Sequence, residues 1–295
     1  MEETQFGKIV FIPGQNDSKY PFCNSLYLRG DRRVVIDPGS DYGRLSSLKE
    51  DPGVDTVWLS HYHEDHFIFL NLFSDRELWM AEADAQAFDS MEHLLDLYGI
   101  DDTGEREEWA PFMVEHFNYT PREVNRTFKP GETIDLGGLT VETIPAPGHT
   151  AGNTAFYVPD EELLFIGDYD LLPFGPWYGD RDSDIDLLIA SAERLREIPA
   201  RIWVTSHSAG FFTDDPGELW DRFLAVIDRR EQELLEYLDR PRTIGEIVDA
   251  RIVYKKAKEP KLFYDFGERA IMTKHLHRLI GRGDVVLEED GYRRV

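Results

Sequence analysis

The chain has 295 residues and a formal net charge of −25, and its 41% hydrophobic content allows a large core in one or two domains. The charge is uneven, because residues 240–295 hold 13 Lys and Arg against 9 Asp and Glu. Such an acidic body repels polyanions and disfavours a general nucleic-acid binder. The single cysteine, Cys23, excludes an internal disulfide. Without a signal-peptide pattern or a membrane-spanning run, we expect a cytoplasmic protein.

The predicted elements alternate between strands and helices along the chain. The first expected strands are residues 7–12, 25–29, 33–37 and 57–59, and the first expected helices are residues 81–98 and 105–118. A helix start is also expected at residues 67–73. Further strands are expected at residues 131–138, 139–145, 154–158, 162–166 and 202–206. Two further helices are expected at residues 184–197, with Asp184 as the N-cap, and at residues 216–238.

The basic C-terminal region has a pattern of its own after a junction at residues 239–242. Helices are expected from residue 243 to 248 and from 270 to 280, followed by strands at 284–288 and 292–294. This order of helix, helix and hairpin resembles a winged-helix-like tail. Such a unit binds DNA in transcription factors. Here we expect it to pack on the acidic body or to form a homodimer contact.

A histidine-rich stretch follows the strand at residues 57–59. It places three imidazoles and one carboxylate within six residues: His61, His63, Asp65 and His66. Imidazole and carboxylate ligands suit zinc, iron or manganese. On an extended strand end His61 and His63 point the same way and can hold one ion. A turn after them would direct Asp65 and His66 toward a second ion, so the spacing favours two metals over a polar loop.

The His-x-His-x-Asp-His pattern resembles the signature of the metallo-β-lactamase superfamily, whose remaining ligands follow in the order His, Asp, His. Here those positions are His149, Asp168 and His207. The resemblance covers roughly residues 7–210 and implies an αββα sandwich of the α/β class. It implies one metal held by His61, His63 and His149, a second held by Asp65, His66 and His207, and Asp168 as the bridge.

The resemblance also sets expectations for the domains and for the surroundings of the metals. We expect a catalytic domain at residues 1–210 with a helical insert at about 81–118, a connecting helix at 211–238 and a winged-helix-like domain at 239–295. Asp37 is expected to hold a ligand histidine by its second nitrogen. Five aromatic residues are candidates for the substrate pocket, with packing in the core as the alternative: Phe67, Phe69, Phe174, Trp177 and Tyr178.

The expected chemistry is hydrolysis of an acyl thioester or related ester by a water activated between two divalent metals, with zinc favoured. Asp65 and Asp168 are the expected catalytic carboxylates, and the substrate is expected to be a small molecule. The resemblance points to the glyoxalase II-like or acyl-thioesterase-like branch. The alternatives left open are a lactonase, a small endoribonuclease, a mononuclear iron persulfide dioxygenase and a non-catalytic regulatory binding protein.

Overall fold

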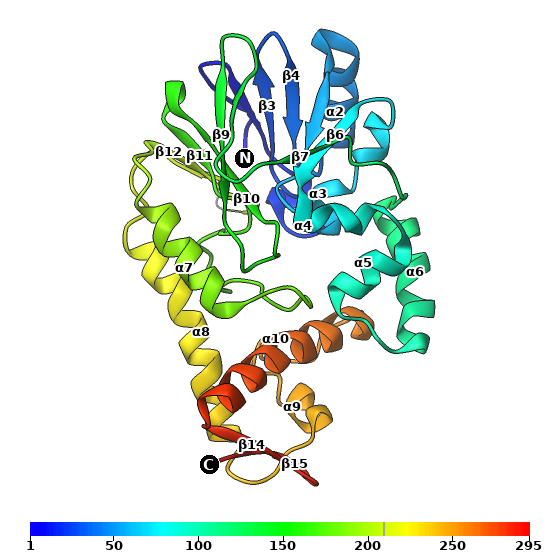
Figure 1. Cartoon of the computed structure of the whole chain (residues 1–295), viewed down its shortest axis with the longest axis vertical. Coiled ribbons are helices and arrows are strands. Elements are labelled where there is room, and N and C mark those ends of the chain that lie inside the picture. Colours follow the sequence, from blue (N-terminus) through cyan, green and yellow to red (C-terminus); the bar gives the residue numbers. More distant parts are fainter. Residues whose placement is uncertain (209) are drawn as a thin grey trace.

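The computed structural model describes residues 1–208 and 210–295, and Figure 1 shows two β-sheets with helices outside them. The first sheet has seven strands in sequence order. Strands β1 to β4 are antiparallel, and β4 to β7 are parallel. Its strands are β1 (Thr4–Phe6), β2 (Ile9–Ile12), β3 (Ser25–Arg29), β4 (Arg33–Ile36), β5 (Thr56–Trp58), β6 (Glu77–Ala81) and β7 (Arg126–Phe128).

The second sheet has six strands in the order β13-β12-β11-β10-β9-β8. Its only parallel pair among the described residues is β11 with β12. Its strands are β8 (Thr133–Asp135), β9 (Thr140–Pro145), β10 (Thr154–Val158), β11 (Leu163–Phe165), β12 (Ile202–Val204) and β13 (Phe211–Phe212).

The inner faces of the two sheets share one apolar core, because side chains alternate between the faces of a strand. On β2, Ile9 and Phe11 point into this core, whereas Val10 and Ile12 face the helical side. Trp58 on β5 joins the sheets, with its ring centroid 5.6 Å from Trp79 of the same sheet and 5.6 Å from Phe156 of the other.

Helices cover the outer face of each sheet, so the predicted αββα sandwich is confirmed. The first sheet is covered by α2 (Tyr42–Leu48) and by the insert, which contains α4 (Glu82–Ala85), α5 (Met91–Tyr98) and α6 (Thr103–Phe117). The second sheet is covered by α7 (Ile185–Arg196), which Asp184 caps as predicted, and by α8 (Glu218–Tyr237). Two short helices, α1 (Gln15–Ser18) and α3 (Glu64–Phe67), lie in the connections.

Two predicted helices differ from the structure. The helix expected at residues 81–98 is divided into α4, a 3₁₀ turn at Gln86–Phe88 and α5, because Ser90 accepts a hydrogen bond from the His93 N–H and starts a new helix. The helix start expected at residues 67–73 is also wrong. There α3 ends at Phe67, and a separate 3₁₀ helix covers Leu70–Phe73.

The C-terminal region contains α9 (Ile244–Ala250), α10 (Lys261–Arg282), β14 (Val285–Glu288) and β15 (Gly291–Arg294). The order of helix, helix and hairpin is the predicted one, whereas the domain division and the likeness to a winged helix stay predictions. Helix α10 begins earlier than expected. Its Gly267 obscured the helical pattern, and a Cβ at this glycine would lie 2.3 Å from the Tyr254 hydroxyl.

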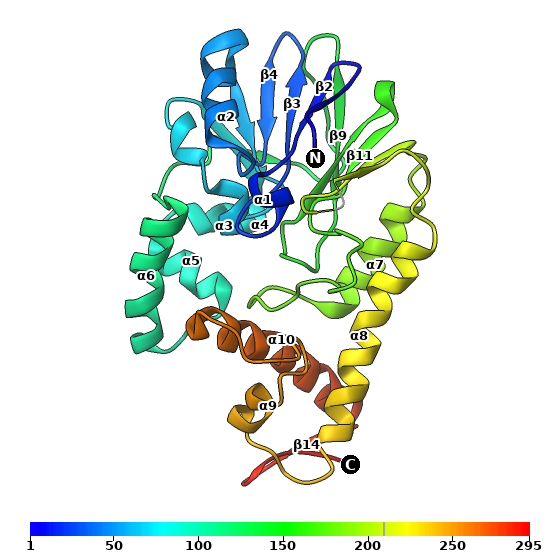
Figure 2. The same ribbon diagram turned by 180° about the vertical axis from the view of Figure 1, so that it is seen from behind.

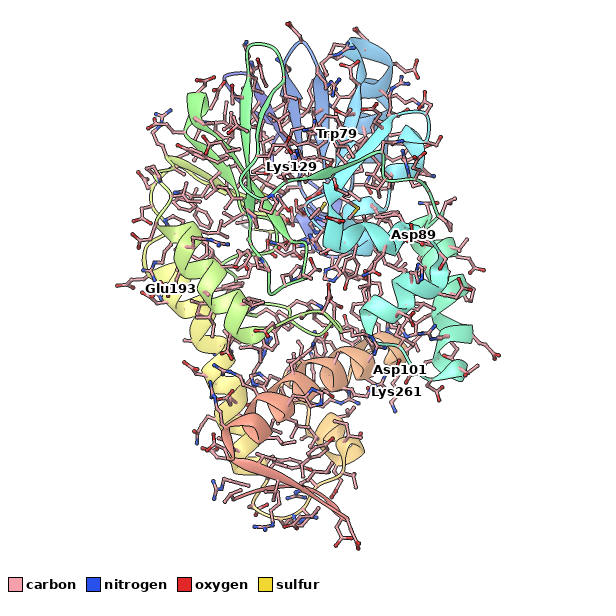
Figure 3. All side chains as sticks on the ribbon, viewed as in Figure 1. Trp79, Asp89, Asp101, Lys129, Glu193 and Lys261 are labelled. Carbon is pink, nitrogen blue, oxygen red and sulfur yellow. The ribbon has the colours of Figure 1, made fainter. Side chains whose placement is uncertain are left out.

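Helix α10 runs beneath the edge of the sandwich from the α7–α8 side to the insert, as both views show (Figures 1 and 2). Its Arg269 forms a two-pronged ion pair with Glu105 of α6 at 2.7 and 2.6 Å. Trp109 of α6 packs against Phe266 with ring centroids 5.2 Å apart. Figure 3 labels Asp101 and Lys261 near this junction, far from Trp79 in the sandwich. The described residues contain no helix long and apolar enough to cross a membrane.

Candidate metal centre

The turn between β5 and α3 presents the first four candidate ligands. After β5 the chain bends at Ser60 and His61 and reaches His63, the N-cap of α3, so His61 and His63 come before the helix. Asp65 and His66 lie within the helix, where the chain has changed direction. All four are buried. The two pairs therefore lie on either side of the start of α3.

The other three candidate ligands come from the second sheet. His149 lies in the loop between β9 and β10, while Asp168 and His207 follow the neighbouring parallel strands β11 and β12. Parallel strands end at the same sheet edge, which brings Asp168 beside His207. The His149 loop depends on Gly148, whose φ is +126° and whose added Cβ would lie 2.2 Å from the Leu188 backbone nitrogen.

The seven side chains form two groups that meet at Asp168. In the first group the Nε2 atoms of His61 and His149 are 3.1 Å apart, and His63 completes the set. In the second group His207 Nε2 lies 3.2 Å from Asp65 Oδ2, and His66 lies beside them. Asp168 and His207 keep 13% and 12% of their side-chain surface exposed, so solvent reaches the centre on their side.

Asp168 turns one carboxylate oxygen toward each group. Its Oδ2 lies 3.5 Å from His149 Nε2 and 3.9 Å from His61 Nε2. Its Oδ1 lies 2.9 Å from His66 Nε2 and 3.6 Å from His207 Nε2. This arrangement suits a carboxylate that bridges two cations.

The second ring nitrogens of the histidines are held by other parts of the fold. His66 Nδ1 lies 2.9 Å from Asp37 Oδ2, which is the contact expected for Asp37. His149 Nδ1 donates to the Trp177 carbonyl at 3.0 Å. His207 Nδ1 lies 3.2 Å from the carbonyls of both Ser18 and Phe22. These acceptors hold a proton on Nδ1, so Nε2 is the nitrogen that is directed at the centre, as metal binding requires.

His63 is oriented the opposite way. Its Nε2 lies 2.7 Å from Asp180 Oδ2, so Nδ1 is the nitrogen left for an ion. Asp180 is completely buried and also accepts from the Trp177 indole N–H at 3.1 Å. Burial opposes a charged ring, yet the Asp180 carboxylate raises the pKa of His63 to about 9.

The protonation states also fit a cation site. Burial, together with the neighbouring His63, lowers the pKa of His149 to about 4, so this imidazole is neutral at pH 7. Asp168 is held ionised, because His66 and His207 keep its pKa well below the ordinary value despite burial. Although burial opposes it, the carboxylates raise the pKa of His66 and of His207, so cation binding is expected to release protons.

Two buried polar atoms that face each other test whether metals fit these residues. His66 Nε2 and Asp168 Oδ1 lie 2.9 Å apart as an ion pair, but neither has a hydrogen bond of acceptable geometry within the described residues. Buried polar atoms without a hydrogen bond are rare and costly. A cation between them would satisfy both, and the donor set of imidazoles and carboxylates suits a divalent transition metal.

Comparison with known proteins agrees with this geometry. The family model described as "Metallo-beta-lactamase superfamily" matches residues 20–207, which is more than half of the chain and includes all seven candidate ligands. The chain belongs to the metallo-beta-lactamase superfamily. The expected superfamily is thereby confirmed.

Two curated relatives share moderate identity with this superfamily member. A hydroxyacylglutathione hydrolase from Hyphomonas neptunium is 29% identical over 173 residues, covering 55% of this chain and 64% of the relative. The chain thus matches less than two thirds of that protein. An atrochrysone carboxyl ACP thioesterase from Paecilomyces divaricatus is 24% identical over 261 residues, covering 82% of this chain and 71% of the relative.

Solved structures of the superfamily match the fold over nearly the whole chain. A metallo-beta-lactamase family protein from Thermus thermophilus has a TM-score of 0.73 at 22% identity, covering 98% of this chain and 99% of that one. A beta-lactamase domain protein from Burkholderia ambifaria has a TM-score of 0.69 at 18% identity, with coverages of 100% and 94%. At these identities the likeness shows the fold alone.

The five aromatic candidates for the substrate pocket have different surroundings. Three lie in the core, where Phe67, Phe69 and Tyr178 are 2%, 9% and 0% exposed, as the alternative of core packing expects. Trp177 is partly buried, and its carbonyl holds His149. Only Phe174 exposes a large surface, at 42%. None of the five therefore has a contact that assigns it to a substrate.

Several supporting residues of this superfamily site were missed in the sequence. Asp180 lies in the loop at residues 169–182, from which the sequence predicted only aromatic candidates. Asp170 accepts from the His207 N–H at 2.8 Å. Asp84 accepts from the Thr150 hydroxyl at 2.8 Å and from the Gly152 N–H at 2.6 Å, which fixes the loop that carries His149. The one available signal was the placement of Asp170 and Asp180 in a loop that follows a ligand.

Proposed function

We propose that this protein is a dinuclear metal-dependent hydrolase that cleaves an acyl thioester or a related ester. The observation that carries the proposal is Asp168, which directs one oxygen toward each three-residue group. By this proposal His61, His63 and His149 hold one divalent metal, and Asp65, His66 and His207 hold the other. The names of the hydroxyacylglutathione hydrolase and the ACP thioesterase favour a thioester among possible ester substrates.

When bound, two such cations supply a water molecule of lowered pKa and a positive charge near the developing oxyanion. The chain's own groups prepare the site for that chemistry. Asp37, Asp180 and the backbone carbonyls hold each imidazole in one tautomer and one orientation. Asp65 is a buried carboxylate within the centre and is suited to accept a proton there.

The proposal is tested on the full chain purified without chelators. Metal per chain is measured by elemental analysis, and hydrolysis of a thioester panel is assayed on the same sample. We expect close to two metals per chain with thioester turnover. Asp168→Ala is expected to abolish turnover, whereas the exposed Asp160→Ala, at the turn before β11, serves as the matched control and is expected to keep it.

Other outcomes would replace the proposal. About one iron per chain without thioester turnover would favour mononuclear oxygenase chemistry. Absence of bound metal, with no recovery on adding zinc or manganese, would favour a binding protein. Full activity of Asp168→Ala would also refute the assigned site.

A further inference from the structure

A small basic hollow lies between α8, the loop at residues 169–182 and the segment that follows α9. Its volume is about 220 Å³. Among its nine lining residues are four cations and no carboxylate: Arg229, Arg230, Lys255 and Lys258. In a chain of net charge −25, such a lining indicates a local preference for anions.

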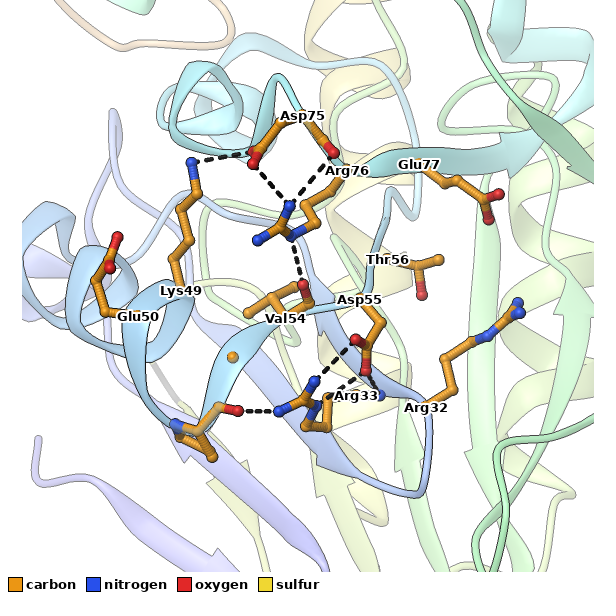
Figure 4. Close-up of a pocket in the computed structure, with 12 residues that line it drawn as sticks. Arg32, Arg33, Lys49, Glu50, Val54, Asp55, Thr56, Asp75, Arg76 and Glu77 are labelled. Carbon is orange, nitrogen blue, oxygen red and sulfur yellow. Dashed lines mark hydrogen bonds and ion pairs between the residues drawn. The ribbon is translucent and has the colours of Figure 1, made fainter.

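A larger hollow elsewhere also has cations in its lining, but it has no comparable preference for anions. Figure 4 draws it near the amino-terminal ends of β5 and β6, with a volume of about 600 Å³. Three of its four cations, Arg33, Lys49 and Arg76, have acidic partners in the same lining. Arg33 pairs with Asp55 at 2.9 Å, and Lys49 pairs with Asp75 at 3.0 Å. Carboxylates of the protein thus neutralise that hollow.

The cations of the small hollow have fewer carboxylate partners than those of the larger one. Arg230 is buried and donates to the carbonyls of Phe174 and Pro176, so it builds the wall. Lys255 forms an ion pair with Glu233 outside the lining. Within residues 1–208 and 210–295, neither Arg229 nor Lys258 forms an ion pair with a carboxylate. These two exposed side chains are available to an anionic ligand.

Aromatic rings stand beside the unmatched charges. Phe174 is 42% exposed and stacks on Tyr254, with ring centroids 5.8 Å apart and an interplanar angle of 28°. The Lys258 ammonium lies 5.5 Å from the centroid of Tyr254 and 5.1 Å from that of Tyr264. Cations bind phosphate groups, and exposed aromatic edges accept planar rings. The combination suits a phosphorylated group that carries a ring, such as a nucleotide.

One short loop joins this hollow to the metal centre. Arg230 holds the carbonyl of Phe174, and three residues later the carbonyl of Trp177 accepts from the candidate ligand His149. Three residues span at most about 11 Å. The hollow therefore lies within reach of a long flexible substrate whose reacting end is at the metals.

We propose that the hollow formed by Phe174, Arg229, Tyr254 and Lys258 binds the nucleotide end of the leaving group of a thioester, as in an acyl-coenzyme A. This proposal rests on the proposed thioester hydrolysis. A free nucleotide offers the same chemistry, so the experiment separates a nucleotide borne by the substrate from a free one.

The first arm measures binding alone. Adenosine 3′,5′-bisphosphate is titrated into the metal-loaded full chain by calorimetry at low and high salt. Arg229→Ala combined with Lys258→Ala is expected to weaken binding by about 10- to 100-fold, because two charged contacts to phosphate are lost. Lys256→Ala removes an exposed neighbouring cation outside the lining and is expected to leave binding unchanged.

The second arm measures turnover of one acyl group on coenzyme A and on the short neutral thiol N-acetylcysteamine. The double variant is expected to raise KM for the coenzyme A ester by about 10-fold or more and to leave the neutral ester unchanged.

The outcomes separate the two proposals. Failure to hydrolyse both esters, together with every other ester of the panel, refutes the proposed function, and the calorimetry then tests the hollow independently. Turnover of both esters without nucleotide binding refutes the hollow. Nucleotide binding with identical KM effects on both esters identifies a site for free nucleotide and overturns the assignment to the leaving group.

Discussion

Replacing Asp180 by Asn is expected to weaken cation binding at the His61, His63 and His149 group by about 10- to 100-fold, or roughly 1.4–2.7 kcal/mol. Asp180 is fully buried and accepts from both His63 Nε2 and the Trp177 indole. Both donors contact the same oxygen, Oδ2, so Asn can still accept from them, but its neutral amide removes the negative charge beside His63 and is a weaker acceptor than a carboxylate. Because the Trp177 carbonyl also holds His149, the substitution disturbs two of the three imidazoles.

The assay is metal content of the full chain after dialysis against a graded series of competing chelator concentrations. The variant is expected to lose one metal at lower chelator than the wild type and to retain the other. Asp184→Asn is the matched control, because Asp184 caps α7 and Asn caps a helix equally well. If Asp180→Asn and Asp184→Asn both followed the wild-type curve, Asp180 would have no role in holding His63.

Three further predictions concern other parts of the fold. Gly39→Ala is expected to reduce metal content at the second group, because the added Cβ would lie 1.9 Å from the Asp65 carbonyl oxygen. The control Gly43→Ala in α2 is expected to retain both metals, because its Cβ meets only an Asp41 oxygen at 3.4 Å. Glu231 is partly desolvated, yet His275 and Arg278 lower its pKa to about 2, so its stabilisation is complete above pH 4.5 and disappears as the pH falls toward 2. Glu231→Gln is therefore expected to lower the free energy of unfolding in urea by about 2 kcal/mol at pH 7 and by almost nothing near pH 2. An equal loss at the two pH values would contradict this. Trp109→Ala is expected to lower the free energy of unfolding by about 3–5 kcal/mol, measured by the same urea unfolding. A loss below about 1 kcal/mol would show that the insert does not depend on the packing of Trp109 against Phe266 of α10.

The candidate ligands could be predicted because their chemistry is local. Three imidazoles and a carboxylate at the end of one strand are visible as side chains in the sequence. The groups that hold His149 and His207 from behind are backbone carbonyls of Trp177, Ser18 and Phe22. Every residue has such a carbonyl, so no side-chain pattern marks them.

The predictions of helix boundaries and of burial were wrong at positions where tertiary contacts determine the structure. The helix start of α10 was missed because Gly267 and its neighbouring aromatic residues do not follow a simple helical pattern, and the glycine is explained only by the approach of Tyr254. Tyr178 lies in a Pro- and Gly-rich loop, which suggested an exposed position. In the fold its hydroxyl lies 2.9 Å from His275 Nε2 and accepts from Arg230 at 3.1 Å, so it is buried.

The packing of Trp109 on Phe266 has a consequence for how this architecture varies among relatives. Phe266 of the tail belongs to the same apolar core as the insert residues around Trp109 and Met113. Neither segment can be exchanged alone without exposing the other's apolar face to water. We therefore expect the insert and the tail to be inherited as one unit, so that relatives with a different tail also differ at the position of Trp109.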